Sequence, residues 1–412
     1  MLPLLARVLL PGVLIAPSDL HHPAPVAPPA CTRTAGLTLP EGFCAVVVAQ
    51  GLGNVRQLAV GPGGELYAAL RGDTGGLLRL RDTDGDGTAD RTDRLFNEGG
   101  TGIAVHDGHL WLATPDRILR WPLPAPTAAT LGAPEVVVAG MPTGGHQEKT
   151  FAFLGGDTLI VNFGSATNSC QVSDRAVRSP GKDPCTELEG RAGLWRFSAS
   201  RLNQRPGDGT RHATGLRNAM ALAVEPATGK LFAAPHGRDQ LSANWGFTDQ
   251  QNAELPSEEF MLVEPGDDFG WPYCYYDQVQ KQKVLAPEYG GDGRATGRCA
   301  GKKAPLIGFP GHWAPMAILF STGTQFPEAY RRGAFIAFRG SWNRAPLPQQ
   351  GYRVVFAPFG ADGRPTGEYQ TFATSSEGDT ALRPAGLAWA ADGSLYIGSE
   401  RGGTIWKVMV AR

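Results

Sequence analysis

Basic and imidazole side chains recur in short polar segments at several places along the chain. His146 lies in GGHQEKTFAF, and Arg217 and Asn218 lie together in GLRNAMALAV. The segment PHGRDQL contains Gly237 and Arg238. The last third of the chain adds the segments GHWAP, FRGSWNR and LRPAG, whose basic residues are His312, Arg339, Arg344 and Arg383. A histidine combined with several arginines is what the binding of an anionic ligand and the removal of a proton together require.

The stretch RDTDGDGTADRTD, residues 81–93, has the spacing of a calcium loop. Its acidic residues fall at the ligand positions of a twelve-residue loop with a glycine at the sixth position, and they are Asp82, Asp84, Asp86, Asp90 and Asp93. The flanking segments have the pattern of strands rather than helices, and an aspartate replaces the usual bidentate glutamate at the last position. We therefore expect at most a structural calcium site away from the catalytic residues, with an empty acidic turn as the alternative.

Three acids in the segment ELPSEEF could suggest glycosidase chemistry by two carboxylates. They are Glu254, Glu258 and Glu259. Because all three crowd one short segment, we expect a solvated loop instead.

Six repeating units provide a common frame for these segments. Each unit has a short apolar strand, a turn that contains glycine and a second apolar strand, and the units start near Leu58, Ile103, Phe151, Leu222, Ile318 and Gly386. Units of about 40–50 residues with several strands each are typical of propeller blades. The sequence predicts an all-β fold over residues 31–412, a six-bladed β-propeller of four-stranded antiparallel blades, with a pair of β-sandwiches as the alternative.

The polar segments lie next to the first or second strand of their units. Equivalent positions in different blades lie on the same face of a propeller, around the mouth of its channel. The repeat therefore predicts that His146, Arg217, Asn218, Arg339 and Arg383 converge. The long insertion at 238–310 is expected to help build the binding site, because insertions on one face commonly do so.

Composition and the N-terminal segment limit the possible functions. With 38 basic and 39 acidic residues the net charge is −1, which argues against an electrostatic nucleic-acid or anionic-membrane partner. Residues 1–30 have one early basic residue and then an apolar run, so we expect a signal peptide, or an N-terminal membrane anchor, followed by a linker. The protein is then exported to the periplasm or the extracellular space.

Six cysteines occur as three pairs of neighbours along the sequence. An even number of cysteines behind an export signal indicates disulfides, with six reduced thiols in a cytosolic protein as the alternative. The simplest of the fifteen possible connectivities joins Cys31 to Cys44, Cys170 to Cys185 and Cys274 to Cys299.

The polar segments, in their order along the chain, resemble those of the soluble quinoprotein sugar dehydrogenases. This family uses pyrroloquinoline quinone (PQQ) and includes sorbosone and aldose dehydrogenase-like proteins. The resemblance extends over roughly residues 36–410, and the combination of GLRN, GWPYC and GSWNR is its most specific part.

The resemblance implies PQQ on the top face of the propeller and a calcium ion beside it. The implied reaction oxidises the anomeric carbon or aldehyde of an aldose-type sugar by hydride transfer to the quinone, and a separate acceptor, a cytochrome or a quinone, takes the electrons. His146 matches the catalytic base, and Arg217 with Asn218 matches the pair that stabilises the quinone oxygen. Gly237 and Arg238 match main-chain ligands of the catalytic calcium.

Several cationic positions match, or are candidates for, contacts to the quinone. Arg339 and Arg383 match residues that bind its carboxylates. Lys149 stands where many relatives have arginine, and His312 and Arg344 are further candidates, with core packing or solvation as the alternatives.

Departures from the family pattern keep two other functions open. Glu148 and Lys149 replace a Thr-Arg pair of many relatives, and Gly145 replaces an aspartate of the glucose dehydrogenases. The alternatives are a calcium-dependent, lactonase-like propeller hydrolase and a non-catalytic binding propeller. The sequence specifies neither the sugar nor the oligomeric state.

Overall fold

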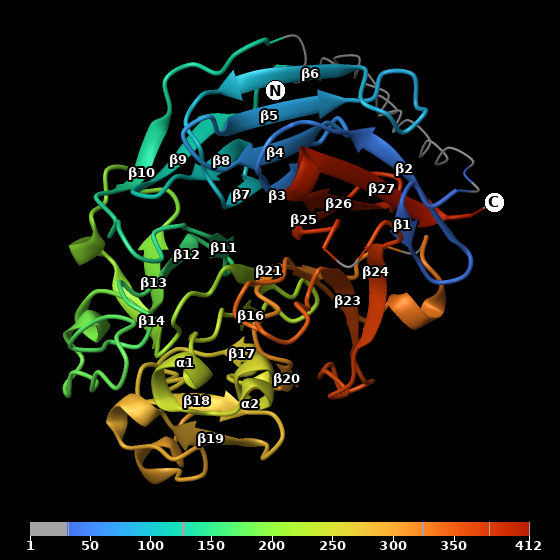
Figure 1. The fold of residues 1–412 in the computed structure, drawn as a ribbon. Helices are drawn as coiled ribbons and strands as arrows, with labels where there is room; N and C mark the ends of the chain where they lie inside the picture. The colour runs from blue at the N-terminus through green and yellow to red at the C-terminus, as the bar shows by residue number, and fades with distance from the viewer. Residues whose placement is uncertain (1–30, 32, 126–127, 324, 379, 412) are drawn as a thin grey trace, which may run out of the picture.

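The structure is a computed structural model that describes residues 31–411 apart from residues 32, 126–127, 324 and 379. The expected export signal or anchor at residues 1–30 lies outside the described residues. Six antiparallel sheets are arranged radially as the blades of a propeller (Figure 1). The expected fold class is therefore confirmed.

The first three blades follow one another along the chain, each from its inner to its outer strand. Blade 1 comprises β3 (Val55–Val60), β4 (Leu66–Leu70), β5 (Gly76–Arg81) and β6 (Arg91–Phe96). Blade 2 comprises β7 (Ile103–His106), β8 (His109–Ala113), β9 (Arg117–Pro122) and β10 (Glu135–Ala139). Blade 3 comprises β11 (Phe151–Phe153), β12 (Thr158–Phe163), β13 (Gly193–Ser198) and β14 (Thr210–Thr214).

The last three blades include strands that are distant in the sequence. Blade 4 comprises β15 (Ala221–Val224), β16 (Leu231–Ala234), β17 (Glu258–Val263) and β20 (Ile307–Phe309). Blade 5 comprises β21 (Pro315–Phe320), β22 (Gly333–Phe338), β23 (Arg353–Pro358) and β24 (Gln370–Ser375), with β1 (Leu37–Thr38) as a fifth strand. Blade 6 comprises β25 (Pro384–Trp389), β26 (Leu395–Ser399), β27 (Thr404–Val410) and β2 (Phe43–Ala49).

The two ends of the described chain close the propeller. β2 pairs with β27 in an antiparallel register that places Phe43 opposite Val410, so the N-terminal part supplies the outer strand of the last blade (Figure 1). The disulfide between Cys31 and Cys44 attaches the preceding residues to this strand. Closure hydrogen-bonds a strand edge that would otherwise be exposed.

Apolar side chains pack between neighbouring blades. The indole of Trp111 in blade 2, for example, lies edge-on to Phe153 of blade 3, with ring centroids 4.9 Å apart. At the centre, Met220, Met316 and Ala385 form a small buried cluster next to the first residues of three inner strands. The side chain of Gln57 donates to the carbonyls of both methionines, at 3.3 and 3.1 Å. These contacts link the inner strands of blades 1, 4, 5 and 6.

Apart from β17 and β20, which belong to blade 4, the insertion at 238–310 forms a layer beside that blade. It contains α1 (Leu241–Trp245), α2 (Asp249–Glu254) and the hairpin of β18 (Cys274–Asp277) and β19 (Gln282–Leu285), which gather at one end of the molecule (Figure 1). The disulfide from Cys274 to Cys299 lies in this layer, and the disulfide from Cys170 to Cys185 lies in the connection from β12 to β13. The expected pairing of neighbouring cysteines is thus present. None of the helices in the described part of the chain is long and apolar enough to cross a membrane.

Candidate active site

The ends of inner and second strands bring the polar segments to one face. His146 precedes β11, Arg217 precedes β15 and Arg383 precedes β25, whereas His236 follows β16 and Arg339 follows β22. The partly buried ring of His236 lies among them. Its pKa is lowered well below its usual value by burial first, and then by the charges of Arg339 and Arg217. Cationic side chains therefore predominate on this face, and they lie close enough for their charges to affect one another.

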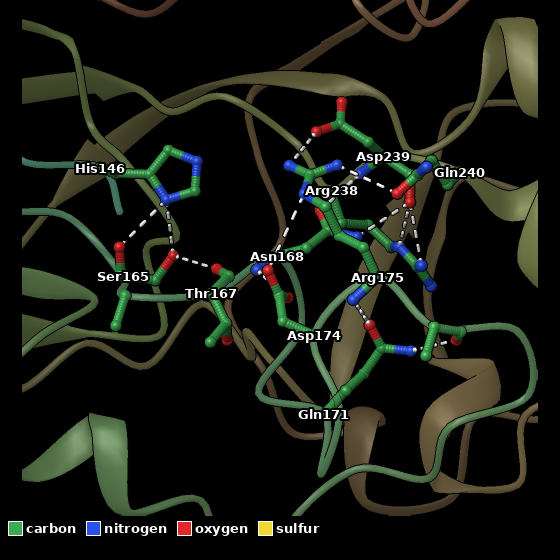
Figure 2. Close-up of polar contacts among 12 residues, drawn as sticks. His146, Ser165, Thr167, Asn168, Gln171, Asp174, Arg175, Arg238, Asp239 and Gln240 are labelled. Atoms are coloured by element: carbon green, nitrogen blue, oxygen red, sulfur yellow. Dashed lines mark hydrogen bonds and ion pairs between the residues drawn. The ribbon is translucent and has the colours of Figure 1, made fainter. Parts of the chain in front are cut away.

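Ser165 fixes the tautomer of the His146 imidazole (Figure 2). Nδ1 of His146 lies 3.0 Å from the carbonyl oxygen and 2.9 Å from the hydroxyl oxygen of Ser165. That hydroxyl donates its own hydrogen to the carbonyl of Thr167 at 2.6 Å, so both Ser165 oxygens accept from Nδ1–H. Nε2 of His146 then carries the lone pair. Burial, followed by the charge of Arg217, lowers the pKa of His146 to about 3, which keeps the ring neutral at physiological pH.

Gly164 allows His146 and Asn218 to approach each other. A Cβ atom on this glycine would lie 2.5 Å from the carbonyl oxygen of His146 and 2.9 Å from Oδ1 of Asn218. Asn162 on β12 donates to the same Oδ1 at 3.1 Å and so orients the amide of Asn218. A larger residue at 164 would separate blade 3 from blade 4 at the site.

Arg217 is buried and its guanidinium binds four oxygen atoms. Nη1 donates to the carbonyl of Gly237 at 2.7 Å, and Nη2 donates to Oδ2 of Asp239 at 3.1 Å and to Oδ1 of Asn168 at 3.0 Å. Nε donates to the carbonyl of Asn168 at 3.1 Å. The planar fork of arginine suits this arrangement, because its five N–H donors can serve several oxygens at once.

Asp239 is the counter-ion of two arginines. Arg175 donates to Oδ2 at 2.9 Å (Figure 2). Arg217 contacts the same oxygen at 3.1 Å. Burial works to raise the pKa of Asp239, but its cationic neighbours, Arg217 foremost, outweigh burial and lower that pKa to about 2. Its partner Arg175 lies in the connection from β12 to β13 of blade 3, whereas Asp239 follows β16 of blade 4.

A second carboxylate, Glu400, lies among three arginines. It contacts Arg56, accepts from Nη1 of Arg339 at 3.0 Å and lies 4.0 Å from Nη2 of Arg383. Nε of Arg56 and Nε of Arg339 are buried and have no hydrogen-bond partner in the described structure. One carboxylate cannot satisfy three guanidinium groups, so this part of the site keeps a surplus of positive charge.

Glu148 and Arg71 form an ion pair next to Arg56. Arg71 donates to Glu148 at 2.8 Å, and the hydroxyl of Thr101 donates to the other oxygen of Glu148 at 2.6 Å. These two hydrogen bonds join the beginnings of blades 2 and 3 to the end of β4. Sequence reasoning missed Arg56 and Glu400. The available signal was that Arg56, like Arg217 and Arg383, lies at the start of an inner strand.

Three side chains that the sequence suggested as cofactor contacts form hydrogen bonds with the protein itself. Nζ of Lys149 donates to the carbonyls of Pro142 and Gln147 at 2.8 and 2.5 Å, which closes the loop around His146. Nε2 of His312 lies 2.7 Å from the carbonyl of Asn252, and its Nδ1 lies 3.8 Å from Asp239. Arg344 contacts the carbonyls of Ala253 and Gly311 and pairs with Glu254 at 2.8 Å. These side chains hold the walls of the site.

The main chain at Gly237 is held by a buried glutamate. Glu258 accepts from the amide of Gly237 at 3.0 Å and from the amide of Ala314 at 3.1 Å, and burial raises its pKa to about 8. The expectation that this glutamate and Glu259 are solvated is wrong, because both lie in the buried strand β17. Arg238 pairs with Glu288 at 2.8 Å in the inserted layer.

The acidic loop lies outside this site, in the connection from β5 to β6. Carboxylate oxygens of Asp82, Asp84 and Asp86 lie within 4.8 Å of one another, and all three residues are exposed. Asp90 accepts from the amide of Thr83 at 2.6 Å. Asp93 belongs to β6 and pairs with Arg79 and Arg81. The structure therefore does not bring it to the cluster of Asp82, Asp84 and Asp86.

Comparison with known proteins identifies the family. A family model described as TrAA12-like matches residues 37–411. The chain belongs to the TrAA12-like family. The expected relationship to quinoprotein sugar dehydrogenases is thereby confirmed, because a curated relative of this TrAA12-like chain is the pyrroloquinoline quinone-dependent pyranose dehydrogenase of Coprinopsis cinerea. The two are 25% identical over 232 residues, which is 47% of this chain and 30% of the relative. The matched segments span less than half the length of the curated relatives.

Solved structures share the fold of this TrAA12-like protein. The calcium structure of the Trichoderma reesei carbohydrate-active enzyme of family AA12 superposes with a TM-score of 0.77 at 20% identity, covering 92% of this chain and 99% of that chain. The holo form of the pyranose dehydrogenase PQQ domain from Coprinopsis cinerea superposes with a TM-score of 0.75 at 20% identity, covering 93% and 100%. At this identity the likeness establishes the six-bladed propeller.

Proposed function

We propose that this protein oxidises an aldose-type sugar at its anomeric carbon or aldehyde, with PQQ as the bound electron acceptor. The observation that carries the proposal is a neutral histidine base placed beside a buried surplus of arginine charge. The relationship to the pyrroloquinoline quinone-dependent pyranose dehydrogenase of Coprinopsis cinerea supports the same cofactor and substrate class.

The residues present fit an anionic quinone. Arg56 and Arg339 each keep a buried Nε–H without a partner in the described structure, and Glu400 neutralises only part of the charge around it. A ligand with carboxylate groups would satisfy these donors. Arg339 and Arg383 would hold its carboxylates, while Arg217 and Asn218 would face its redox-active oxygens. When bound, the quinone supplies the two-electron acceptor that amino-acid side chains lack.

His146 is proposed to take the proton from the sugar hydroxyl through Nε2. The resulting imidazolium would keep its Nδ1–H on the two oxygens of Ser165, which stabilise the new charge. Without a ligand the pKa of His146 is held at about 3, in part by the charge of Arg217. An anion bound between these cations would offset that charge, so cofactor binding would raise the pKa of His146 toward the range useful for a base.

A calcium ion is proposed at the main-chain oxygens of Gly237 and Arg238. The carbonyl of Gly237 and Oδ2 of Asp239 already converge on one cation, the guanidinium of Arg217. Glu258 fixes the peptide that carries the Gly237 amide. Oxygen donors of this kind are those that calcium prefers, and the ion would supply Lewis acidity.

The cellular setting is proposed from the disulfides. Three disulfides are favoured by an oxidising compartment, which supports export to the periplasm or the extracellular space, with an N-terminal anchor as the alternative to secretion. A separate cytochrome or quinone would then accept the electrons.

Reconstitution tests the function. The purified protein is mixed with PQQ and calcium, quinone binding is followed by absorbance, and a panel of aldoses is offered with a dye acceptor. We expect dye reduction that His146→Ala abolishes without loss of quinone binding, while His109→Ala, at the start of β8 in blade 2, retains activity. Absence of quinone binding would refute the proposal, and hydrolysis of a lactone panel without quinone would support the lactonase-like alternative.

A further inference from the structure

Trp342 is the one aromatic residue among the exposed large apolar side chains of the described residues. Its relative exposure is 61%, and the other members of that group are valines and leucines. It lies three residues after Arg339, in the connection from β22 to β23. That connection begins on the face of the propeller that carries the candidate site.

The backbone on both sides of Trp342 is anchored. The hydroxyl of Tyr352 donates to the carbonyl of Ser341 at 3.2 Å, which closes the two ends of the loop at 340–351. Asn252 donates to the carbonyl of Asn343 at 2.6 Å, and Arg344 pairs with Glu254 at 2.8 Å. The indole is therefore presented to solvent by a loop whose neighbouring residues are buried and fixed.

The same anchors connect the loop to the candidate site. Nδ2 of Asn343 lies 3.1 Å from Nε2 of His312, and Nδ1 of His312 lies 3.8 Å from Asp239. Asp239 is the ion-pair partner of Arg217. Trp342 is thus separated from the residues around Arg217 by a short chain of buried contacts.

A cavity of about 300 Å³ adjoins the other end of this loop. Its lining is formed by residues 348–353 together with Thr374. Oε1 of Gln349 is buried there without a hydrogen-bond partner in the described structure, and Gln350 accepts from the indole of Trp313 at 3.4 Å. Amide and hydroxyl groups of this kind match the hydroxyl groups of a neutral ligand.

We propose that the loop at 340–353 is a saccharide-binding subsite. Trp342 supplies an apolar platform for the C–H face of a pyranose ring, and the amide group of Gln349, which lines the cavity, forms a hydrogen bond with a sugar hydroxyl. The proposal rests on the proposed sugar oxidation and assigns substrate recognition to blade 5. A sugar with a second ring beyond its reducing end has more apolar surface to place on this loop than a monosaccharide has.

Binding and kinetics of Trp342→Ala, Trp342→Phe and Gln349→Ala test the subsite. Val279→Ala is the matched control, because Val279 is a 77% exposed apolar side chain in the inserted layer. Binding of glucose and cellobiose to the quinone-free protein is followed by saturation-transfer NMR, and kcat and KM are measured with PQQ and calcium. For Trp342→Ala and Gln349→Ala we expect weaker cellobiose binding and a KM raised about threefold to tenfold. The kcat and the quinone affinity should be unchanged, and Trp342→Phe should retain most of the binding.

The outcomes separate this subsite from the proposed function. Sugar oxidation with an unchanged KM in Trp342→Ala would overturn the subsite and leave the function intact. Trp342-dependent saccharide binding without any oxidation would support the subsite and refute the function. A variant that loses only electron transfer to a protein acceptor would show that the loop is a docking surface, which also overturns the subsite.

Discussion

Ser165 accepts hydrogen bonds from both the backbone amide and the ring Nδ1 of His146. The carbonyl of Ser165 lies 3.0 Å from each of these nitrogens. Its own amide donates to the carbonyl of Arg217 at 2.8 Å, so one residue ties the proposed base to the next blade. Orientation of the imidazole is thus set largely by the main chain, and the hydroxyl adds a second acceptor.

Replacement of Ser165 by alanine should have a smaller effect than loss of the histidine. The variant keeps the carbonyl acceptor and loses one hydrogen bond, so kcat/KM should fall at most about tenfold. His146→Ala should lower it by about 10²–10⁴. Steady-state kinetics of the PQQ-loaded variants provide the comparison. Equal losses in the two variants would show that the hydroxyl itself acts on the substrate.

The lowered pKa of His146 predicts a pH dependence of stability. The folded protein binds this proton only near pH 3, whereas the unfolded chain binds it near the ordinary histidine pKa of 6.5. Between these values the unfolded state carries more protons, so the free energy of unfolding falls as pH falls from 6.5 toward 3. His146→Asn should lose less stability over this range. Urea midpoints at pH 4.5 and 7.5 measure the difference, and an identical pH dependence in both proteins would contradict the assignment.

Asp239→Asn should destabilise the protein through its two arginines. The change removes the ion-pair partner of buried Arg217 and leaves the partly exposed Arg175 with only Asp174, at 3.9 Å, which should cost about 3 kcal/mol of unfolding free energy. Asp183→Asn is the control, because the Asp183 pair with Arg298 is about half exposed and its loss should cost much less stability. Urea denaturation of the quinone-free proteins gives both values. Similar losses would mean that the Asp239 carboxylate is screened by solvent.

Glu400→Gln should lower the stability of the quinone-free protein and increase its stabilisation by the cofactor. Arg56, Arg339 and Arg383 lose their shared carboxylate, so the melting temperature without PQQ should fall. An anionic ligand would replace the missing charge, so the rise in Tm on adding PQQ should exceed that of the wild type. Glu98→Gln, which alters a half-exposed pair with Arg117, should leave that rise unchanged. A smaller rise in Glu400→Gln would show that Glu400 orients the arginines for the cofactor.

Asp84→Asn should leave sugar oxidation unchanged. The exposed cluster of Asp82, Asp84 and Asp86 lies in the connection between two outer strands of blade 1, away from Gly237. Turnover and its calcium requirement should therefore stay within about twofold of the wild type, a change of less than about 0.5 kcal/mol. Loss of turnover would place the functional calcium in this loop.

The sequence by itself determined the blades and the face that carries the site. Apolar alternation and turn glycines are local properties, and they placed inner strands near Leu58, Ile103 and Phe151, where β3, β7 and β11 lie. Blade equivalence then placed His146 and Arg217 on one face, because repeated units present equivalent ends together.

Tertiary structure alone decided how the charges on that face are paired. Glu400 pairs with Arg56, and Asp239 pairs with Arg175. The partners in each pair are far apart in the sequence, so no local sequence pattern predicts them. Glu258 looked solvated because acids crowd its segment, yet the pairing of β17 with β16 and β20 buries it against the Gly237 amide. The free energy of a buried charge depends on which groups surround it in space, and only the closed propeller brings those groups together.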